Sequence, residues 1–136
     1  MEKTILLVDD DADLRRVVRG ILQPLGRIIE ASNGKDALRM TAVEKPGLML
    51  LDVAMAEMDG LSVMKAARFL DPALPIVMLT GEHDLETAKR ALDDGASAYI
   101  TKPFDPEGLR EEARRLICAA EGARETESGR PWTVRK

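Results

Sequence analysis

The chain has 136 residues, 45% hydrophobic and 32% charged, with a formal net charge of −4, which fits one globular domain of ordinary size. The mildly acidic charge and the shortage of aromatic residues argue against direct nucleic-acid binding. The sequence has no apolar run of about 20 residues, which argues against a membrane span. Cys118 is the single cysteine, which excludes an internal disulfide and suggests a reducing compartment. The acidic run Asp9–Asp11 lies too near the N-terminus for a signal peptide, so we expect a cytoplasmic protein.

Five short apolar runs alternate with longer amphipathic stretches. The runs predict strands at Thr4–Val8, Arg27–Ala31, Gly47–Leu51, Pro75–Leu79 and Ser97–Ile100. The first four are dense in Val, Ile, Leu and Met without polar alternation, which is typical of strands covered on both faces. The fifth is shorter and more mixed, which suits a strand at the edge of a sheet.

The stretches between the strands carry apolar residues at helical spacing. They predict helices that begin near Leu14, after the cap residue Asn33, at Leu61, after the cap residue Asp84 and near Leu109, and that end near Gly26, Glu44, Leu70, Asp93 and Ala120. Five strands alternating with five helices predict an α/β fold, a doubly wound parallel sheet joined by right-handed crossovers. Functional side chains of such sheets lie at the carboxyl ends of the strands.

The regular pattern ends near residue 120. Residues 121–136 are polar, contain Gly122, Gly129 and Pro131, and show no helical period. We interpret residues 1–120 as the domain and residues 121–136 as a polar tail or the start of a linker.

Acidic residues and a lysine follow the predicted strands. The residues at the strand ends are Asp9, Asp10 and Asp11 after the first strand, Asp52 after the third, Thr80 after the fourth and Lys102 after the fifth. Carboxylates brought together on one rim repel each other, and a divalent cation relieves this repulsion. Oxygen ligands alone favour Mg²⁺, whose charge together with that of Lys102 balances Asp9, Asp10 and Asp52.

Five short motifs mark these positions. They are Val8-Asp9-Asp10, Leu51-Asp52, Met58-Asp59-Gly60, Thr80-Gly81 and Tyr99-Ile100-Thr101-Lys102-Pro103-Phe104. In this order and spacing they resemble the CheY-like receiver domain of bacterial two-component response regulators, over about residues 3–120. The resemblance implies a flavodoxin-like (βα)5 fold with a five-stranded parallel sheet.

The resemblance also implies an acceptor and a metal site. Asp52 corresponds to the residue that takes a phosphoryl group from a histidine kinase or a phosphotransfer protein. Asp10 corresponds to a direct Mg²⁺ ligand and Asp9 to a ligand through water. The backbone carbonyl of Ala54 stands where the family supplies a further metal ligand. Phosphoryl transfer needs mainly positioning and charge neutralisation, which such a site supplies.

Three further side chains are implied in the response to phosphorylation. Lys102 is expected to pair with the phosphoryl oxygens, from a Lys102–Pro103 peptide bond that is often cis in the family. Thr80 is expected to move toward the phosphoryl group and Tyr99 to turn inward, although Tyr99 could also simply cover the sheet edge. The altered face would comprise Asp84–Leu92, Ala98–Ile100 and Pro106–Leu116, where a downstream effector docks or a second copy forms a homodimer.

The chain departs from the family pattern in the loop after Asp52. Ala56 stands where a proline is usual, which frees the loop from Asp52 to Gly60. Ala54 is small, which leaves the acceptor open to water or to a partner's histidine. Ala56 therefore keeps open an alternative, a degenerate receiver that acts as a phosphorylation-independent interaction module.

Two other functions fit parts of the pattern. A haloacid-dehalogenase-like phosphohydrolase would use Asp9 and Asp11 as its nucleophile pair, but it needs a later acidic pair on a strand, and only Asp105 and Glu107 follow. A flavin carrier needs a first loop that binds phosphate, which three aspartates would repel. We therefore expect a signalling domain that catalyses only its own phosphorylation and dephosphorylation.

Other conspicuous residues are interpreted structurally. Asp11 is expected to cap a helix, Asp59–Gly60 to form a plain turn, His83 to be an ordinary solvated residue and Cys118 to be an inert residue of the last helix. Packing in the core and at its rim is expected for Met49, Met55, Met58, Met64 and Met78.

Overall fold

The computed structural model describes residues 3–55 and 59–127, with the backbone alone for residues 82 and 122–127. In chain order the elements are β1 (Lys3–Val8), α1 (Ala12–Leu22), β2 (Gly26–Ala31), α2 (Gly34–Glu44), β3 (Leu48–Asp52), α3 (Gly60–Leu70), β4 (Ile76–Thr80), α4 (Leu85–Asp93), β5 (Ala98–Thr101) and α5 (Pro106–Glu127). Short 3₁₀ turns at Gln23–Leu25 and Glu82–Asp84 precede β2 and α4. No helix in these ranges is long and apolar enough to cross a membrane.

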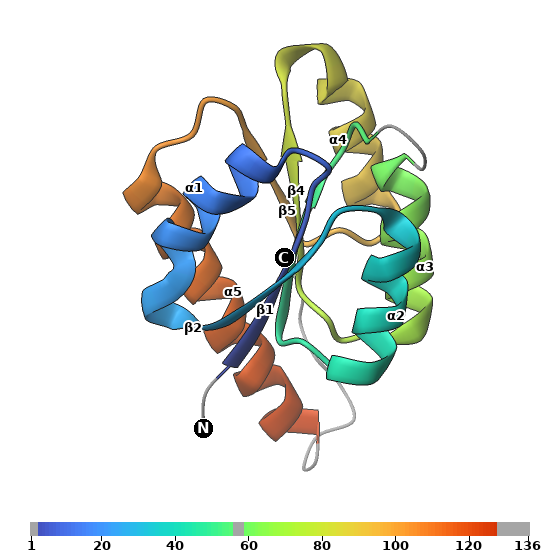
Figure 1. Cartoon of the computed structure of the whole chain (residues 1–136). Coiled ribbons are helices and arrows are strands. Elements are labelled where there is room, and N and C mark those ends of the chain that lie inside the picture. The colour runs from blue at the N-terminus through green and yellow to red at the C-terminus, as the bar shows by residue number, and fades with distance from the viewer. Residues whose placement is uncertain (1–2, 56–58, 128–136) are drawn as a thin grey trace.

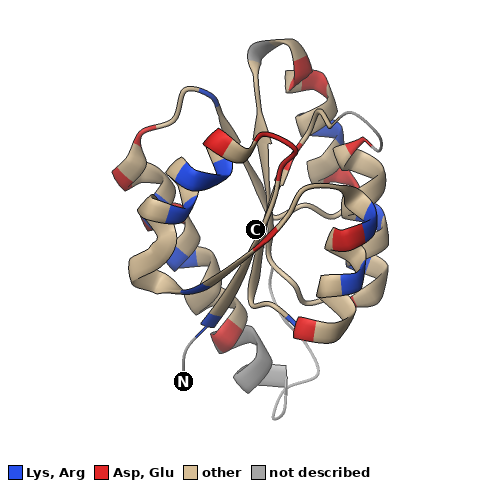
Figure 2. Ribbon diagram, in the orientation of Figure 1, with Lys and Arg blue, Asp and Glu red and all other residues tan. Residues whose placement is uncertain are grey.

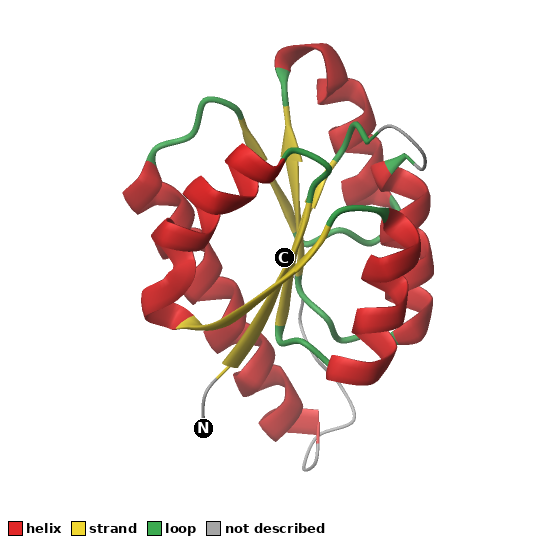
Figure 3. Cartoon of the chain, viewed as in Figure 1, coloured by secondary structure: helices red, strands yellow, loops and turns green. Residues whose placement is uncertain are grey.

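The strands form one five-stranded parallel sheet in the order β2-β1-β3-β4-β5. Helices α1 and α5 cover one face and α2, α3 and α4 cover the other (Figure 1, Figure 3). This arrangement confirms the predicted doubly wound, flavodoxin-like fold. The strand order reverses between β1 and β3, so the carboxyl ends of these two strands form the rim where such folds place functional groups.

Side-chain alternation along the strands builds an apolar layer on each face of the sheet. In β1, Ile5 and Leu7 join the cluster shared with α1 and α5, whereas Leu6 and Val8 join the cluster shared with α2, α3 and α4. Strands β3 and β4 are buried along their whole length, which explains why their sequences are apolar without alternation. The edge strand β5 is only partly buried, except for the exposed Thr101, as its mixed sequence predicts.

Two of the three predicted helix caps are confirmed. The Asp11 side chain accepts two backbone N–H groups of the first turn of α1, and the Asn33 side chain accepts the N–H of Asp36 in α2. The prediction for Asp84 is wrong, because its side chain makes no capping hydrogen bond to α4. Asp84 ends the 3₁₀ turn that leads directly into α4, so its backbone lacks the extended conformation from which a cap side chain reaches the helix.

The last helix is longer than the sequence pattern predicts. Its apolar stripe stops near Ala120, but α5 continues to Glu127. A single interior glycine, Gly122, costs only about 1 kcal/mol relative to alanine and does not end a helix. Glu121 also forms an ion pair with Lys3 at the start of β1. The division of the chain at residue 120 stays a prediction, and residues 128–136 lie outside the described residues.

The residues interpreted as ordinary follow that interpretation where they are described. His83 and Cys118 are exposed. Of the methionines expected to pack, Met49, Met64 and Met78 are buried and Met55 is partly buried, whereas Met58 lies outside the described residues.

Candidate functional site at the carboxyl ends of the strands

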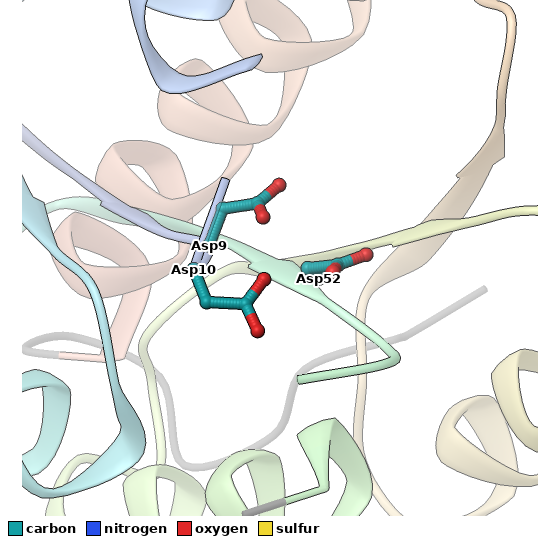
Figure 4. A group of neighbouring side chains, drawn as sticks. All are labelled: Asp9, Asp10 and Asp52. Carbon is teal, nitrogen blue, oxygen red and sulfur yellow. The ribbon is translucent and has the colours of Figure 1, made fainter. Parts of the chain in front are cut away.

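Three carboxylates meet where β1 and β3 end. Parallel pairing places Val8 beside Leu51, so the residues that follow them, Asp9 and Asp52, are neighbours on the rim. One carboxylate oxygen each of Asp9, Asp10 and Asp52 lies within 4.8 Å of the other two (Figure 4). Figure 2 shows the acidic residues at the end of β1. Asp9 and Asp52 are buried, whereas Asp10 is exposed, so the cluster opens to solvent on the side of Asp10.

Asp9 carries an unsatisfied oxygen. Its Oδ1 accepts the N–H of Asp11 at 2.9 Å, but its Oδ2 is buried without a hydrogen-bond partner among the described residues. Burial, with the negative charge of Asp52 adding to it, raises the pKa of Asp9 to about 6, against the opposing effect of the Asp11 N–H and of Lys102. A bound cation or a water on that cation would satisfy this oxygen and favour its ionised form.

Asp52 forms an ion pair across the sheet. Its Oδ1 accepts the Lys102 Nζ at 3.0 Å, and the backbone N–H of Ala54 also donates to its carboxylate. Burial raises the pKa of Asp52, although Lys102 opposes this shift. The Lys102–Pro103 peptide bond is cis, as predicted. The hydrogen bond from Lys102 places its ammonium against the carboxylate that was predicted to be the acceptor.

Thr80 lies at the end of β4, fully buried, and its hydroxyl donates to the carbonyl of Gly81 at 2.9 Å. Among the described residues it makes no hydrogen bond to Asp52. Tyr99 lies on β5 beside Met78 and packs, partly buried, against the apolar layer under α2, α3 and α4. The rim thus brings Asp9, Asp10, Asp52 and Lys102 into one cluster, with Thr80 and Tyr99 on the strands next to it.

The structure describes Ala54 and Asp59 of the loop residues discussed above, and Asp59 departs from its prediction. Ala54 is exposed next to Asp52, as expected from its position after the strand. Ala56, the departure from the family pattern, lies outside the described residues. Asp59 does not form a plain turn with Gly60, because its side chain accepts the N–H of Ser62 and caps α3.

Gly60 contributes to the site in a way that the sequence did not reveal. It opens α3 and donates its N–H to the carbonyl of Val53 at 2.9 Å. A Cβ at this position would lie 2.4 Å from the carbonyl oxygen of Asp52 and 2.8 Å from the Cα of Val53. Only glycine therefore lets α3 pack on the backbone that presents Asp52. The available signal was the pair of a cap residue and a glycine eight positions after Asp52.

Arg15 is a second residue that sequence reasoning missed. Its guanidinium donates to the backbone carbonyl of Asp9 at 2.6 Å and to Glu30 on β2 at 2.9 Å. In the sequence Arg15 is one of several charged residues in an amphipathic helix. Only the packing of α1 against β2 shows that it reaches the acidic loop.

Comparisons with known proteins agree on one family. Residues 5–114 match the sequence model of the response regulator receiver domain. The chain is 34% identical over 113 residues to the C4-dicarboxylate transport transcriptional regulatory protein DctD of Rhizobium meliloti, covering 82% of the chain and 25% of that protein. It is 38% identical over 115 residues to the transcriptional regulatory protein ZraR of Salmonella typhimurium, covering 84% of the chain and 26% of that protein. The chain thus spans about a quarter of the length of these relatives.

Solved structures agree with this match. The crystal structure of NtrX from Brucella abortus in complex with ADP superposes with a TM-score of 0.89 at 33% identity, covering 99% of this chain and 31% of that one. A CheY-like response regulator receiver domain protein from Methanospirillum hungatei superposes with a TM-score of 0.85 at 30% identity, covering 90% of this chain and 99% of that one. From its fold, the order of its motifs and these matches, we conclude that the chain belongs to the family of response regulator receiver domains.

Proposed function

We propose that this domain is a phosphorylation switch in which Asp52 accepts a phosphoryl group in a Mg²⁺-dependent reaction. The donor is a phosphohistidine of a sensor histidine kinase or of a phosphotransfer protein. The observation that carries the proposal is the position of the buried Asp52 carboxylate, which lies 3.0 Å from the Lys102 ammonium and in one cluster with Asp9 and Asp10.

The residues fit a magnesium ion. The cluster offers only oxygen donors, which is the ligand type that Mg²⁺ prefers, and its open side leaves room for the waters that this ion keeps. The unpartnered Oδ2 of Asp9 supports the same interpretation. Asp10 and Asp52 would bind the ion directly, together with the backbone carbonyl of Ala54, and Asp9 would bind it through water. When bound, Mg²⁺ neutralises charge on the carboxylates and on the phosphoryl oxygens.

In the transfer step, an oxygen of Asp52 bonds to phosphorus while the bond from phosphorus to the donor's histidine nitrogen breaks. The electron pair of the broken bond stays on that nitrogen. Lys102 already lies against Asp52, so a short movement brings its ammonium from the carboxylate to a phosphoryl oxygen. The product is an aspartyl phosphate whose phosphoryl oxygens carry close to two negative charges where the Asp52 carboxylate carried one.

The added charge acts next on Thr80. Its hydroxyl is held by the neutral carbonyl of Gly81, and a charged phosphoryl oxygen is a stronger acceptor. When Thr80 turns toward Asp52, space opens behind β4 that the Tyr99 side chain on the neighbouring β5 fills. The face built from α4, β5 and α5 changes with it.

This face is proposed to contact a downstream effector domain or protein, and a homodimer through the same face is compatible with it. DctD and ZraR are regulatory proteins several times longer than this chain, which supports an effector as the receiver of the signal. Direct nucleic-acid binding by this domain is not proposed. A cytoplasmic location is proposed, because the phosphodonor of such a domain is a kinase inside the cell.

The acceptor is tested by the isosteric variant Asp52→Asn. With acetyl phosphate and Mg²⁺, the wild-type chain is expected to gain the mass of one phosphoryl group, and Asp52→Asn to gain none because its amide is not a nucleophile. Asp36→Asn, which makes the same change on α2 outside the carboxylate cluster, is the matched control and should label as the wild type does. Intact-protein mass spectrometry reads out all three, and labelling of Asp52→Asn to the wild-type level would rule out Asp52.

The alternatives predict other outcomes. A degenerate receiver would leave the wild type unlabelled while still binding its partner. A haloacid-dehalogenase-like phosphohydrolase would place its phosphoryl group on Asp9 and would label Asp52→Asn. The structure does not favour the phosphohydrolase, because Asp105 accepts the N–H of Gly108 at the start of α5 and is not a member of the carboxylate cluster of Asp9, Asp10 and Asp52.

A further inference from the structure

The acidic loop after β1 is tied to β2 through both backbone polar groups of Asp9, its N–H and its carbonyl. The N–H of Asp9 donates to the carbonyl of Ala31 at 3.1 Å. The carbonyl of Asp9 accepts the Nη1 of Arg15 at 2.6 Å, and the Nε of Arg15 donates to Glu30 at 2.9 Å. Glu30 and Ala31 are the last two residues of β2. The backbone that carries the carboxylates is therefore tied to the strand end directly and through Arg15.

The Arg15 guanidinium is itself well fixed. Its side chain is only 17% exposed, and it comes from the second turn of α1, whose cap residue Asp11 lies in the same loop. The second oxygen of Glu30 also pairs with Arg19 at 2.5 Å, but the Arg19 side chain is 45% exposed. A planar guanidinium with two donors engaged has little freedom to rotate.

The contact at the Asp9 carbonyl bears on Asp10. That carbonyl belongs to the peptide group that joins Asp9 to Asp10, so its direction determines where the Cα of Asp10 lies and where its side chain leaves the backbone. Asp10 is the exposed member of the carboxylate cluster, whereas Asp9 and Asp52 are buried. The direction of the Asp9–Asp10 peptide group therefore bears directly on where the Asp10 carboxylate lies.

We propose that Arg15, oriented by Glu30, is a positioning residue for the Mg²⁺ site and acts by holding the Asp9–Asp10 peptide group. The inference rests on the proposed function, since it concerns the same metal site. It makes the edge strand β2, which contributes no ligand, part of the apparatus that determines metal affinity.

Charge and positioning predict opposite effects for the loss of Arg15. Its positive charge close to the carboxylates opposes a cation, so on electrostatic grounds alone its removal should strengthen Mg²⁺ binding. If Arg15 acts by positioning, its removal should weaken binding. Arg15→Lys separates the two effects further, because lysine keeps the charge but cannot bridge Asp9 and Glu30 with a rigid pair of donors.

The experiment measures Mg²⁺ affinity of the full chain by calorimetric titration with MgCl₂, for the wild type, Arg15→Met, Arg15→Lys and Arg19→Met. Arg19→Met is the matched control, because Arg19 lies on the same helix and pairs with the same glutamate but donates to no backbone atom of the loop. Loss of an outer contact of a metal site typically weakens binding by about tenfold or more, and this is expected for both Arg15 variants. Arg19→Met is expected to stay within about twofold of the wild type, as for a partly exposed ion pair.

A second readout separates positioning from general damage to the fold. With acetyl phosphate as donor, the Arg15 variants should need more Mg²⁺ for half-maximal labelling but should reach the wild-type rate at saturating Mg²⁺. Arg15 variants that bind Mg²⁺ as tightly as the wild type, or more tightly, would overturn the inference, and if Arg15→Met does not fold, Arg15→Lys decides. If the wild type binds Mg²⁺ no better than Asp10→Ala, the proposed metal site fails and the inference fails with it. If the wild type binds Mg²⁺ and is labelled, and the Arg15 variants bind Mg²⁺ and are labelled as the wild type is, the inference about Arg15 is refuted while the proposed metal site stands.

Discussion

At the scale of single residues, the proposed phosphoryl transfer depends on carboxylates that the fold keeps from water. Asp9 and Asp52 are 4% and 5% exposed, and burial raises the pKa of both. Ionised carboxylates in such a position cost folding free energy unless a cation is bound. If the proposed Mg²⁺ binds here, the folded domain should be less stable without it at neutral pH, and this difference can be measured.

The pKa of Asp9 leads to a pH-dependent prediction. Because its pKa is about 6 in the folded chain and near 3.8 in the unfolded one, the folded state binds more protons between these values. Without Mg²⁺, the free energy of unfolding should fall as the pH rises through this window, and Asp52 adds to the fall. Asp9→Asn should raise it at about pH 7.5 by on the order of 1–3 kcal/mol and much less at about pH 4.

Urea unfolding in the presence of a chelator measures this effect, with Asp36→Asn as a control for the loss of one negative charge. In the wild type, Mg²⁺ should raise the unfolding free energy more at about pH 7.5 than at about pH 5, since only the ionised carboxylates bind it. An Asp9→Asn variant that is equally destabilised at every pH would contradict the assignment of a buried, uncompensated charge to Asp9.

At the scale of elements, the site depends on how closely α3 approaches β3. Gly60 lets the first turn of α3 rest on the backbone of Asp52 and Val53. The N–H of Val53 in turn donates to the carbonyl of Leu79 on β4 at 2.9 Å. The end of β3 is therefore clamped between a helix and a neighbouring strand, which keeps the Asp52 carboxylate directed toward Lys102.

Gly60→Ala tests this close approach. The added Cβ would meet backbone atoms at 2.4 and 2.8 Å that cannot move aside as a flexible side chain can. We expect the variant to lose about 1–3 kcal/mol of unfolding free energy, the usual cost of overpacking, and to be phosphorylated more slowly. Gly20→Ala on α1 is the control, because its Cβ would meet nothing within 4 Å, and it should gain about 0.5–1 kcal/mol from helix propensity. Equal stability of the two variants in urea would show that α3 can shift without cost.

At the scale of the whole molecule, signalling requires that a change at Asp52 reach a surface on other elements. Backbone hydrogen bonds run from the site across the sheet: the N–H of Lys102 donates to the carbonyl of Thr80 at 2.7 Å, so the ends of β4 and β5 move together. Both strands contact α4. A displacement of Thr80 therefore has a short covalent and hydrogen-bonded route to α4 and β5.

Thr80→Ala tests this route with hydrogen exchange along α4. Beryllofluoride, which mimics a phosphoryl group on the acceptor, should alter exchange in Leu85–Asp93 of the wild type. It should still bind to Thr80→Ala but leave α4 largely unchanged, because the hydroxyl that responds to it is missing. Thr41→Ala is the matched control, since Thr41 is also buried and donates to a backbone carbonyl, that of Ala37, at 2.8 Å. An α4 response in Thr80→Ala equal to that of the wild type would exclude Thr80 as the relay.

The type and order of the elements followed from the sequence by itself, because they depend on residues that are neighbours along the chain. Apolar runs predicted the strands, and Asp11 and Asn33 predicted the starts of two helices. The convergence of Asp9, Asp10, Asp52 and Lys102 was also predictable, since a parallel sheet brings the carboxyl ends of its strands to one edge. The catalytic and switching roles of these residues remain predictions for the experiments above.

Only the tertiary structure decided the features that depend on contacts between distant segments. Three features are of this kind, because each depends on how separate elements pack. They are the buried Oδ2 of Asp9 without a partner among the described residues, the close packing of Gly60 on Asp52 and the contact of Arg15 with Glu30. The local sequence pattern also gave two wrong predictions. Asp84 does not cap α4, because a 3₁₀ turn precedes the helix, and α5 extends beyond its apolar stripe. Helical spacing shows which side of α1 is apolar, but a hydrogen bond from Arg15 to a backbone carbonyl requires the relative positions of α1, β1 and β2, and these are determined by packing of the whole domain.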